Sequence, residues 1–391
     1  MKRSTSYHHL NRKTSGLHDR QKSISNLQGK PAALDGKQSS PEPHLPYGSK
    51  ETGNSGAMNN TTHTRAKGRK KDVLEKFIES PQSLLNASLS QLRHTILCEG
   101  LPADCPYRCY IWSILLRASP IESEWYSGVV SRGPIDSETV GPSSKYVNVG
   151  DKIKNDVFRT FQNNKDFWNK VSESEFMRML NTFAWCVVEN DVAQDYKNDQ
   201  APDIILSPYV QGMNVLAAPI LYVCRSEPQA FALYYKLLMV HMPRYITPTL
   251  SGAMDGVKLV ELVLLCVDGK LAKTLSCNMA SAKIYALPSI LTLSACTPSL
   301  NEVTKLWDFL FSFGVHMNVM IVVAQLFLIR ADLMSSKSPI GLLRQFPNLN
   351  AEKIIKLSLS IAKSIPDDLY DLIVRHTYDE SVSKLIDNYK I

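Results

Sequence analysis

The chain has 391 residues, of which 44% are hydrophobic and 21% are charged, so it is long enough and apolar enough to bury a large core. Its formal net charge of +7 belongs to residues 1–72, which hold 14 basic and 5 acidic residues, whereas the rest of the chain holds 30 and 32. This balance gives no indication of nucleic-acid binding by the folded part, so no nucleic-acid partner is expected.

The first segment, residues 1–72, is rich in Ser, Thr, Asn, Gly, Pro, Lys and His and shows no apolar periodicity. Such a composition cannot offset the entropy that is lost on ordering, so we expect a disordered basic tail. Its first residues lack the apolar segment of a secretory signal. The basic run at 65–71 has two interpretations, a solvated linker or a patch for nuclear localisation or for an anionic surface.

A helical pattern begins after this tail. Ser88 and Gln91 have the spacing of a capping box, and apolar residues follow at helical intervals up to Gly100, which suits a position just after a helix end. Pro106 suits the first turn of the next helix, which we expect to continue to about Leu116.

Residues 118–150 are rich in Gly, Pro and Ser and are predicted to form a long loop. Further helices are predicted between proline and glycine breaks, over 151–162, 173–190, 211–224, 228–241, 256–267, 299–314, 317–334, 350–364 and 366–374. Few runs alternate apolar and polar residues, so little sheet is expected. The sequence therefore predicts one large all-α domain over residues 73–391.

Neither a transmembrane segment nor a metal site is expected. The most apolar stretch, 319–329, is shorter than the roughly 20 residues that cross a bilayer, and it is predicted to be a core helix. The eight cysteines form no C-x-x-C pair and have no zinc spacing with histidines, which favours buried, reduced thiols in a cytoplasmic protein. The sequence also lacks the motifs of P-loop nucleotide binding, zinc proteases and serine hydrolases.

Two short motifs carry the functional hypothesis. The first contains Ile153, Asp156 and Arg159, which fall within about 120° of one another on a helix that turns about 100° per residue. Ile153 is expected to anchor this face to the core, and Asp156 lies close enough to fix the direction of Arg159. A preorganised, outward-pointing arginine is what phosphoryl transfer in trans requires. An ordinary amphipathic helix with an Asp–Arg pair is the alternative.

The second motif is Tyr209-Val-Gln-Gly-Met-Asn214. The preceding loop places Gln211 near the start of a helix, and Gly212 is expected to let the backbone of a partner approach closely. The side-chain amide of a glutamine can orient an attacking water molecule. A helix-initiating turn with a solvated glutamine is the alternative.

In this order the motifs resemble those of the TBC domain, a family that activates small GTPases. The resemblance includes Arg108-Cys-Tyr-Ile-Trp112 and Leu306-Trp-Asp-Phe-Leu-Phe-Ser-Phe-Gly314, and it covers roughly residues 89–376. It implies a TBC-type helical domain that supplies catalytic residues in trans and has no hydrolase activity of its own. GTP and Mg²⁺ would be held by a Ras-superfamily partner, so no cofactor is expected for this chain.

The resemblance also implies a role for each motif residue. Arg159 is expected to be the arginine finger and Gln211 the glutamine finger, and Asp156 is expected to hold the finger helix and the loop in place. Other residues are expected to shape the glutamine loop or to be structural, and these supporting residues are Tyr209, Gly212, Met213, Asn214, Arg108 and Trp112.

Within this family the chain is most similar to the fungal mitotic-exit and septation checkpoint subgroup, on the segments 245–250, 294–298 and 306–322. That likeness implies a Ras-like mitotic GTPase as substrate, a scaffold subunit as a second partner, and a cytoplasmic location at the spindle pole body. Two other hypotheses stay open. One is a non-catalytic scaffold that binds a GTPase, and the other is an activator of a vesicle-traffic Rab.

Overall fold

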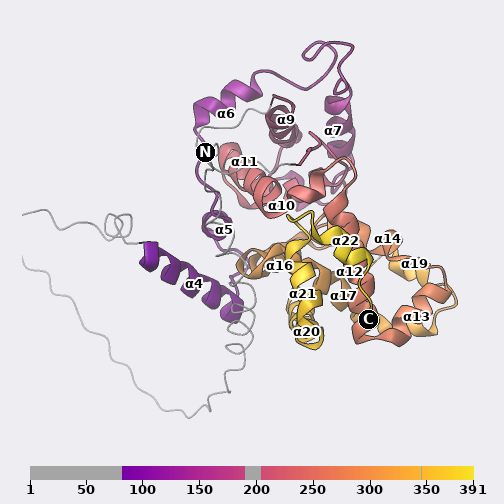
Figure 1. Ribbon diagram of the computed structural model, residues 1–391. Helices are drawn as coiled ribbons and strands as arrows, with labels where there is room; N and C mark the ends of the chain where they lie inside the picture. Colours follow the sequence, from indigo (N-terminus) through magenta and orange to yellow (C-terminus); the bar gives the residue numbers. More distant parts are fainter. Residues whose placement is uncertain (1–81, 190–203, 345) are drawn as a thin grey trace, which may run out of the picture.

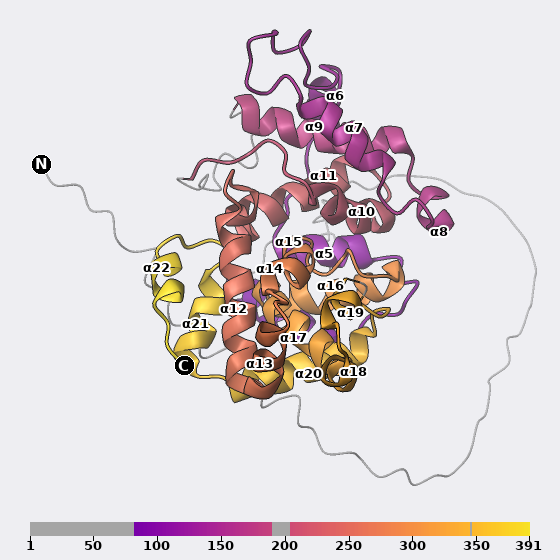
Figure 2. The same ribbon diagram turned by 90° about the vertical axis from the view of Figure 1, so that its right-hand side faces the viewer.

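The computed structural model describes residues 82–189, 204–344 and 346–391, and Figures 1 and 2 show it from two sides. The regular elements in these three ranges are all helices, so the all-α prediction is confirmed. The predicted disordered tail, residues 1–72, lies outside the described residues. No helix within the described ranges is long and apolar enough to cross a membrane.

The helices form two groups, which Figure 1 shows one above the other. The upper group contains α6 (Ser123–Val130), α7 (Val149–Phe158), α8 (Lys165–Trp168), α9 (Glu173–Glu189), α10 (Met213–Val223) and α11 (Glu227–Lys236). The lower group contains α12 (Ser251–Val267), α13 (Gly269–Cys277), α14 (Ala282–Tyr285), α15 (Leu287–Leu291), α16 (Leu300–Phe313), α17 (Asn318–Leu328), α18 (Arg330–Ser335), α19 (Pro339–Leu343), α20 (Ala351–Ser364), α21 (Asp367–Arg375) and α22 (Val382–Asp387). Between the groups, α5 (Arg108–Leu116) packs against α10, α11 and α16. At the side of the lower group, α4 (Gln82–Glu99) packs against α16 and α5.

The core of the lower group is built around α17. Every residue of this helix from 318 to 326 is buried, and the helix packs against α12 and α20. A helix that is apolar all round its surface belongs in the interior of a domain. The predicted core helix over the apolar stretch 319–329 is therefore confirmed.

The upper group is organised around α9. Its apolar residues Phe176, Met179, Leu180 and Phe183 recur at three- and four-residue intervals and are fully buried. The helix packs against α6, α7, α10 and α11. Consequently α7, which carries the first motif, and α10, which follows the second, are both supported by one helix.

Helix boundaries differ from the predictions near the start of the described chain. The first helix of the described residues, α4, begins at Gln82 rather than Ser88, so the Ser88 capping box lies inside a helix instead of starting one. Gly100 follows its end with φ +74°, which confirms the predicted glycine position. The next helix, α5, begins at Arg108, two residues after Pro106, and ends where predicted.

Several short helices are missing from the prediction. The predicted loop at 118–150 contains α6 and the first residues of α7. In the same way α13, α14, α15, α19 and α22 have no counterpart among the predicted helices, and the predicted helix 317–334 is divided into α17 and α18. The missed helices α13, α14, α15, α19 and α22 have four to nine residues, too few for a clear 3.6-residue period. In α15 and α19 a proline in the first turn looks like a break in the sequence.

Buried polar residues join α5 to α16. Arg108 Nε donates to both carboxylate oxygens of Asp308, at 3.1 and 3.2 Å. Its two Nη atoms donate to the backbone carbonyls of Pro102 and Ala103. Trp112 Nε1 donates to the same carboxylate at 2.7 Å, and this tryptophan is fully buried. The R-x-x-x-W motif therefore lies in the core.

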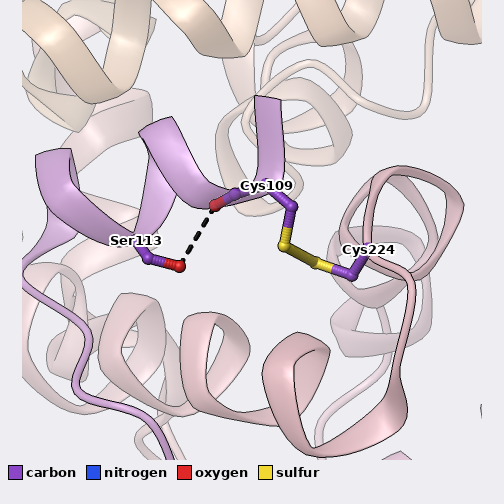
Figure 3. The surroundings of a disulfide bond; sticks show 3 residues. All are labelled: Cys109, Ser113 and Cys224. Atoms are coloured by element: carbon purple, nitrogen blue, oxygen red, sulfur yellow. Dashed lines mark hydrogen bonds between the residues drawn. A yellow bond between two sulfur atoms is a disulfide. The ribbon is translucent and has the colours of Figure 1, made fainter. Parts of the chain in front are cut away.

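A disulfide joins Cys109 in α5 to Cys224, which directly follows α10 (Figure 3). The two Cα atoms are 5.3 Å apart, which is within the range that a disulfide spans. The prediction of reduced thiols is wrong for this pair, because packing brings together cysteines that are 115 residues apart in the chain. The other six cysteines, all in the described residues, are reduced thiols. Among those six only Cys186 is buried, so the expectation of buried thiols is also wrong for most of them.

Candidate functional site

The first motif lies at the carboxyl end of α7. Ile153 is fully buried and anchors the helix, and Asp156 is 3% exposed. The helix ends at Phe158, and Arg159 follows as its C-terminal cap. The predicted helix over 151–162 is therefore too long, because Phe161 adopts a left-handed conformation, with φ 46°, that an α-helix does not contain.

A single buried carboxylate connects the two motifs. Asp156 Oδ1 forms an ion pair with the guanidinium of Arg159. Its other oxygen, Oδ2, accepts a hydrogen bond from the hydroxyl of Tyr209 at 2.8 Å. The Arg159 side chain is 56% exposed and that of Asp156 only 5%. Asp156 therefore binds the exposed arginine through a buried carboxylate and also contacts the second motif, at a residue that is 53 positions away in the chain.

Tyr209 acts as a hydrogen-bond donor in this contact. Burial, and then the hydrogen bond to Asp156 and its negative charge, raise the pKa of the Tyr209 hydroxyl well above its ordinary value. The phenol therefore stays protonated at neutral pH. A protonated phenol is the form that can donate to a carboxylate, which accepts only.

The turn that carries Gln211 depends on the glycine after it. Gly212 has φ +105°, a conformation that residues with a side chain rarely adopt. A Cβ atom at this position would lie 3.0 Å from the Leu291 side chain. Gly212 is buried, so the expectation that it lets a partner backbone approach is wrong; the close neighbour is α15 of this chain. Gln211 itself is exposed, directly before the glycine that caps α10.

Met213 and the first turn of α10 hold this loop from the other side. The backbone N–H of Val210 points at Met213 Sδ, at 3.2 Å, and the N–H of Met213 donates to the carbonyl of Val210. The hydroxyl of Tyr234, from α11, donates to the carbonyl of Met213 at 3.1 Å. The loop is thus fixed by buried groups on both sides of the exposed glutamine.

A second connection between the motifs runs through Thr160 and Asn214. Asn214 Nδ2 donates to Thr160 Oγ1 at 2.7 Å, and Thr160 Oγ1 donates to the carbonyl of Asp156 at 2.6 Å. The N–H of Gly212 donates to Asn214 Oδ1 at 3.1 Å. Thr160 was not among the predicted site residues. The signal in the sequence was its place beside Arg159, but its partner is 54 residues away, which spacing does not reveal.

In this site, buried hydrogen-bonded residues support two exposed polar side chains, Arg159 and Gln211. Arg159 presents a guanidinium, which can bind phosphoryl oxygens through several planar donors. Gln211 presents an amide, which can both donate to and accept from a water molecule. Beside them, Phe158 is 70% exposed on the last turn of α7. Within the described residues, no group of three or more His, Cys, Asp or Glu side chains is placed to hold a metal ion.

Comparison with known proteins gives a consistent assignment. The sequence profile of the Rab-GTPase-TBC domain family matches residues 105–334. The chain is 43% identical to the mitotic check point protein BUB2 of Saccharomyces cerevisiae, over 79% of this chain and 98% of that protein. It is 38% identical to cell division control protein 16 of Schizosaccharomyces pombe, over 79% of this chain and 95% of that protein. It is also 36% identical to the putative mitotic check point protein BUB2 of Dictyostelium discoideum, over 78% and 79% of the two chains.

Among solved structures, the chain is similar to the crystal structure of the Ypt/Rab-GAP domain of Gyp1p, with a TM-score of 0.54 and 16% sequence identity. The match covers 70% of this chain and 91% of that one. At this level of identity the likeness concerns the fold alone.

Proposed function

The chain belongs to the Rab-GTPase-TBC domain family, and we propose that it accelerates GTP hydrolysis on a small GTPase by supplying Arg159 and Gln211 in trans. The observation that carries this proposal is the buried Asp156 carboxylate, which binds the exposed Arg159 with one oxygen and Tyr209, two residues before Gln211, with the other. Both proposed fingers are therefore supported by one buried group.

Arg159 is proposed to stabilise negative charge on the transferred phosphoryl group. A guanidinium that is already held in place needs little reorganisation at the moment of reaction, which is the condition under which such a group is most effective. An arginine finger contributes roughly 10³- to 10⁵-fold in rate, or about 4–7 kcal/mol of transition-state stabilisation. The 56% exposure of the Arg159 side chain leaves it accessible to a docked partner.

Gln211 is proposed to orient the attacking water molecule. Its amide lies on an exposed turn whose backbone is fixed by Gly212 and Met213. In this proposal the partner GTPase holds GTP and Mg²⁺, and the chain needs no cofactor of its own. The remaining motif residues, Arg108 and Trp112, are proposed to be structural, in line with their burial.

The substrate is proposed to be a Ras-like GTPase that acts in mitotic exit or septation. The names of the relatives, mitotic check point protein and cell division control protein, support this cellular role. The same relationship is the reason to propose a scaffold subunit as second partner and a location at the spindle pole body. Activation of a vesicle-traffic Rab is the competing proposal, and the Rab-GTPase-TBC family name is the observation that favours it.

The experiment is single-turnover GTP hydrolysis on a panel of purified GTPases that contains Ras-like mitotic GTPases and several Rabs. Each is measured alone, with the full chain, and with the full chain plus the scaffold subunit. We expect acceleration on a Ras-like mitotic GTPase. Acceleration on a Rab alone would change the substrate and keep the mechanism. Binding to a GTPase without acceleration of any member would instead support a non-catalytic scaffold.

A further inference from the structure

Gln211 lies between two tethers that lead to the same end of α7. The first is the hydroxyl of Tyr209 on Asp156, two residues before Gln211. The second is the side chain of Asn214 on Thr160, three residues after it. Both ends of the glutamine turn are therefore attached to the segment that contains Arg159.

The direction of each hydrogen bond in the second tether is set by the two backbone groups at its ends, the N–H of Gly212 and the carbonyl of Asp156. The N–H of Gly212 only donates, so the atom of Asn214 that faces it must be the carbonyl oxygen. The amide nitrogen of Asn214 must then face Thr160, to which it donates. The backbone carbonyl of Asp156 only accepts, so the Thr160 hydroxyl donates its one hydrogen bond to that carbonyl. The Thr160 oxygen can then accept the hydrogen bond from Asn214. The Asn214 amide nitrogen also lies 3.4 Å from the Asp156 carbonyl, a longer second contact with the same turn. The shorter contact, at 2.7 Å, is the one with Thr160.

Burial makes the second tether rigid. Thr160 is 3% exposed and Asn214 is 5% exposed, so water does not readily replace either partner. A buried polar group that loses its partner bears the full desolvation penalty, which favours the paired arrangement strongly. The contacts of Met213 with Val210 and Tyr234 hold the turn to α10 and α11. The two tethers, on opposite sides of Gln211, restrain both its orientation and its distance relative to α7.

We propose that Thr160 and Asn214 are positioning residues that hold the Gln211 turn in register with Arg159. This inference rests on the proposed function, because register between the two residues matters only if both act on one nucleotide. Neither residue is required to touch the GTPase. Their contribution is to keep two groups from distant parts of the chain ready for the same reaction, and small misplacements of reacting groups slow catalysis by as much as roughly 100-fold.

The test uses Thr160→Val, which keeps the shape of the side chain and removes the hydroxyl. In single-turnover hydrolysis with saturating full chain, we expect the rate to fall by roughly 10- to 100-fold. The concentration for half-saturation should change by less than about threefold, because the docking surface is intact. Thr160→Ser retains the hydroxyl and should recover most of the rate. An unchanged saturating rate for Thr160→Val would overturn the proposal.

A double-mutant comparison separates positioning from general damage. If Thr160 acts through Gln211, the Thr160→Val change should have a clearly smaller effect when Gln211 is already alanine. The same fold-loss in both backgrounds would contradict the proposal. Thr182→Val is the matched control, since Thr182 is a buried threonine whose hydroxyl also donates to the carbonyl four residues earlier, in α9. It is expected to show no such dependence on Gln211.

Hydrogen exchange provides a readout that does not need a GTPase. The amide of Gly212 donates to Asn214, so Thr160→Val should speed its exchange although residue 160 is distant in sequence, and Thr182→Val should not. Unchanged exchange would overturn the tether. If Thr160→Val does not fold, Asn214→Ser serves in the hydrolysis assay, because its side chain is too short to reach Thr160, and the same loss of rate is expected. The exchange of Gly212 is not used with this variant, since Asn214 is itself the acceptor of that amide. A failure of Arg159→Ala to slow hydrolysis would count against the proposed function, while the exchange result still decides the tether.

Discussion

At the scale of single residues, the two motifs divide into buried and exposed members. Asp156, Tyr209 and Asn214 are buried and bind one another or the backbone, whereas Arg159 and Gln211 are exposed. This division gives different expectations for substitutions. Replacing an exposed member should change the reaction and leave the fold intact, and replacing a buried member should change both.

Gln211→Ala tests the exposed glutamine. We expect the rate of GTP hydrolysis at saturating protein to fall by about 10- to 100-fold, because water is no longer oriented for attack. The melting temperature should not change, since the side chain is exposed. Gln91→Ala is the matched control, because it removes an exposed glutamine from α4. A rate equal to that of the wild type would show that the GTPase orients the water with its own residues.

Part of this site could be predicted from the sequence. The three-residue spacing of Asp156 and Arg159 predicts that they meet on a helix, and they do. The contacts of Asp156 with Tyr209 and of Thr160 with Asn214 could not be predicted, because they join residues more than 50 positions apart. Such contacts depend on how α7 and α10 pack on α9, which local patterns do not determine.

At the scale of helices, length explains much of what the sequence revealed, although the long helices α4 and α12 begin before their predicted starts at 88 and 256. The helices α9, α16 and α20 have 14 to 17 residues and clear apolar faces, and their predicted boundaries are correct to within about two residues. The short helices α14, α15 and α19 have four or five residues and were missed. These short helices are stabilised by packing against longer neighbours. Their own sequences therefore show little helical periodicity from which they could be predicted.

The disulfide between α5 and the end of α10 gives a prediction at this scale. Alkylation of the unfolded, unreduced protein should modify six of the eight cysteines, and prior reduction should expose all eight. Because the bond closes a loop of over 100 residues, its removal by Cys109→Ser should lower the free energy of unfolding by about 2–4 kcal/mol. Cys98→Ser, at an exposed free cysteine, is the control. Eight modified cysteines without reduction would contradict the disulfide.

A buried ion pair fastens the C-terminal segment to α12. Arg244 donates to Asp255 at 2.8 Å, to Ser383 at 2.6 Å and to the carbonyls of His376 and Asp379. Arg244→Met leaves the buried Asp255 carboxylate without its cation, so we expect the free energy of unfolding to fall by about 3–5 kcal/mol. Denaturant titration measures this change.

The matched control for Arg244 is an exposed ion pair that also involves α12. Lys258 in α12 pairs with Asp387 in α22, and both side chains are largely accessible to solvent. Lys258→Met should therefore change the free energy of unfolding by less than about 1 kcal/mol. Equal effects of the two substitutions would show that burial does not decide the strength of these contacts.

At the scale of the whole molecule, stability should depend on pH through a buried histidine. His376 is fully buried; its Nδ1 donates to the carbonyl of Ile373, so its Nε2 accepts from the hydroxyl of Tyr245. This pattern uses the neutral ring. Burial is the main reason that the pKa of His376 falls from 6.5 to about 4.

The sign of the effect follows from these two values. Well above pH 6.5 the histidine is neutral in both the folded and unfolded states, so it adds no pH dependence to the free energy of unfolding. Between pH 6.5 and 4 the unfolded state binds a proton that the folded state does not, so stability falls as the pH falls. At pH 5 the loss is about 2 kcal/mol for this one group.

Comparison with a variant isolates this contribution. His376→Asn does not titrate, so its difference in unfolding free energy from the wild type should shrink by about 2 kcal/mol between pH 7.5 and 5. Asp308, whose pKa burial raises to about 6, favours folding as the pH falls, but it is present in both proteins and cancels. His94→Gln, on the exposed surface of α4, is the control substitution. A pH-independent difference for His376→Asn would contradict the neutral buried ring.

The all-α class of the fold could be predicted from the sequence, but the packing arrangement of its helices could not. Composition and helical periodicity predict a large all-α domain, and the match of residues 105–334 to the family agrees. That α9 supports both motifs, and that α5 joins the two groups of helices, depends on contacts between distant segments. The order of motifs along the chain therefore carried the functional hypothesis further than any single pattern did.

In the proposed mechanism, Arg159 acts on a nucleotide that is held by another protein. The most direct measurement is single-turnover GTP hydrolysis by the responsive GTPase with saturating wild-type, Arg159→Ala or Arg159→Lys protein. We expect roughly 10³- to 10⁵-fold slower hydrolysis with Arg159→Ala and little recovery with lysine, which lacks the planar donors of the guanidinium. Retained binding and a cooperative unfolding transition should accompany that loss, because Arg159 is exposed and Asp156 keeps its hydrogen bond from Tyr209. Wild-type acceleration by a folded Arg159→Ala protein would contradict the account.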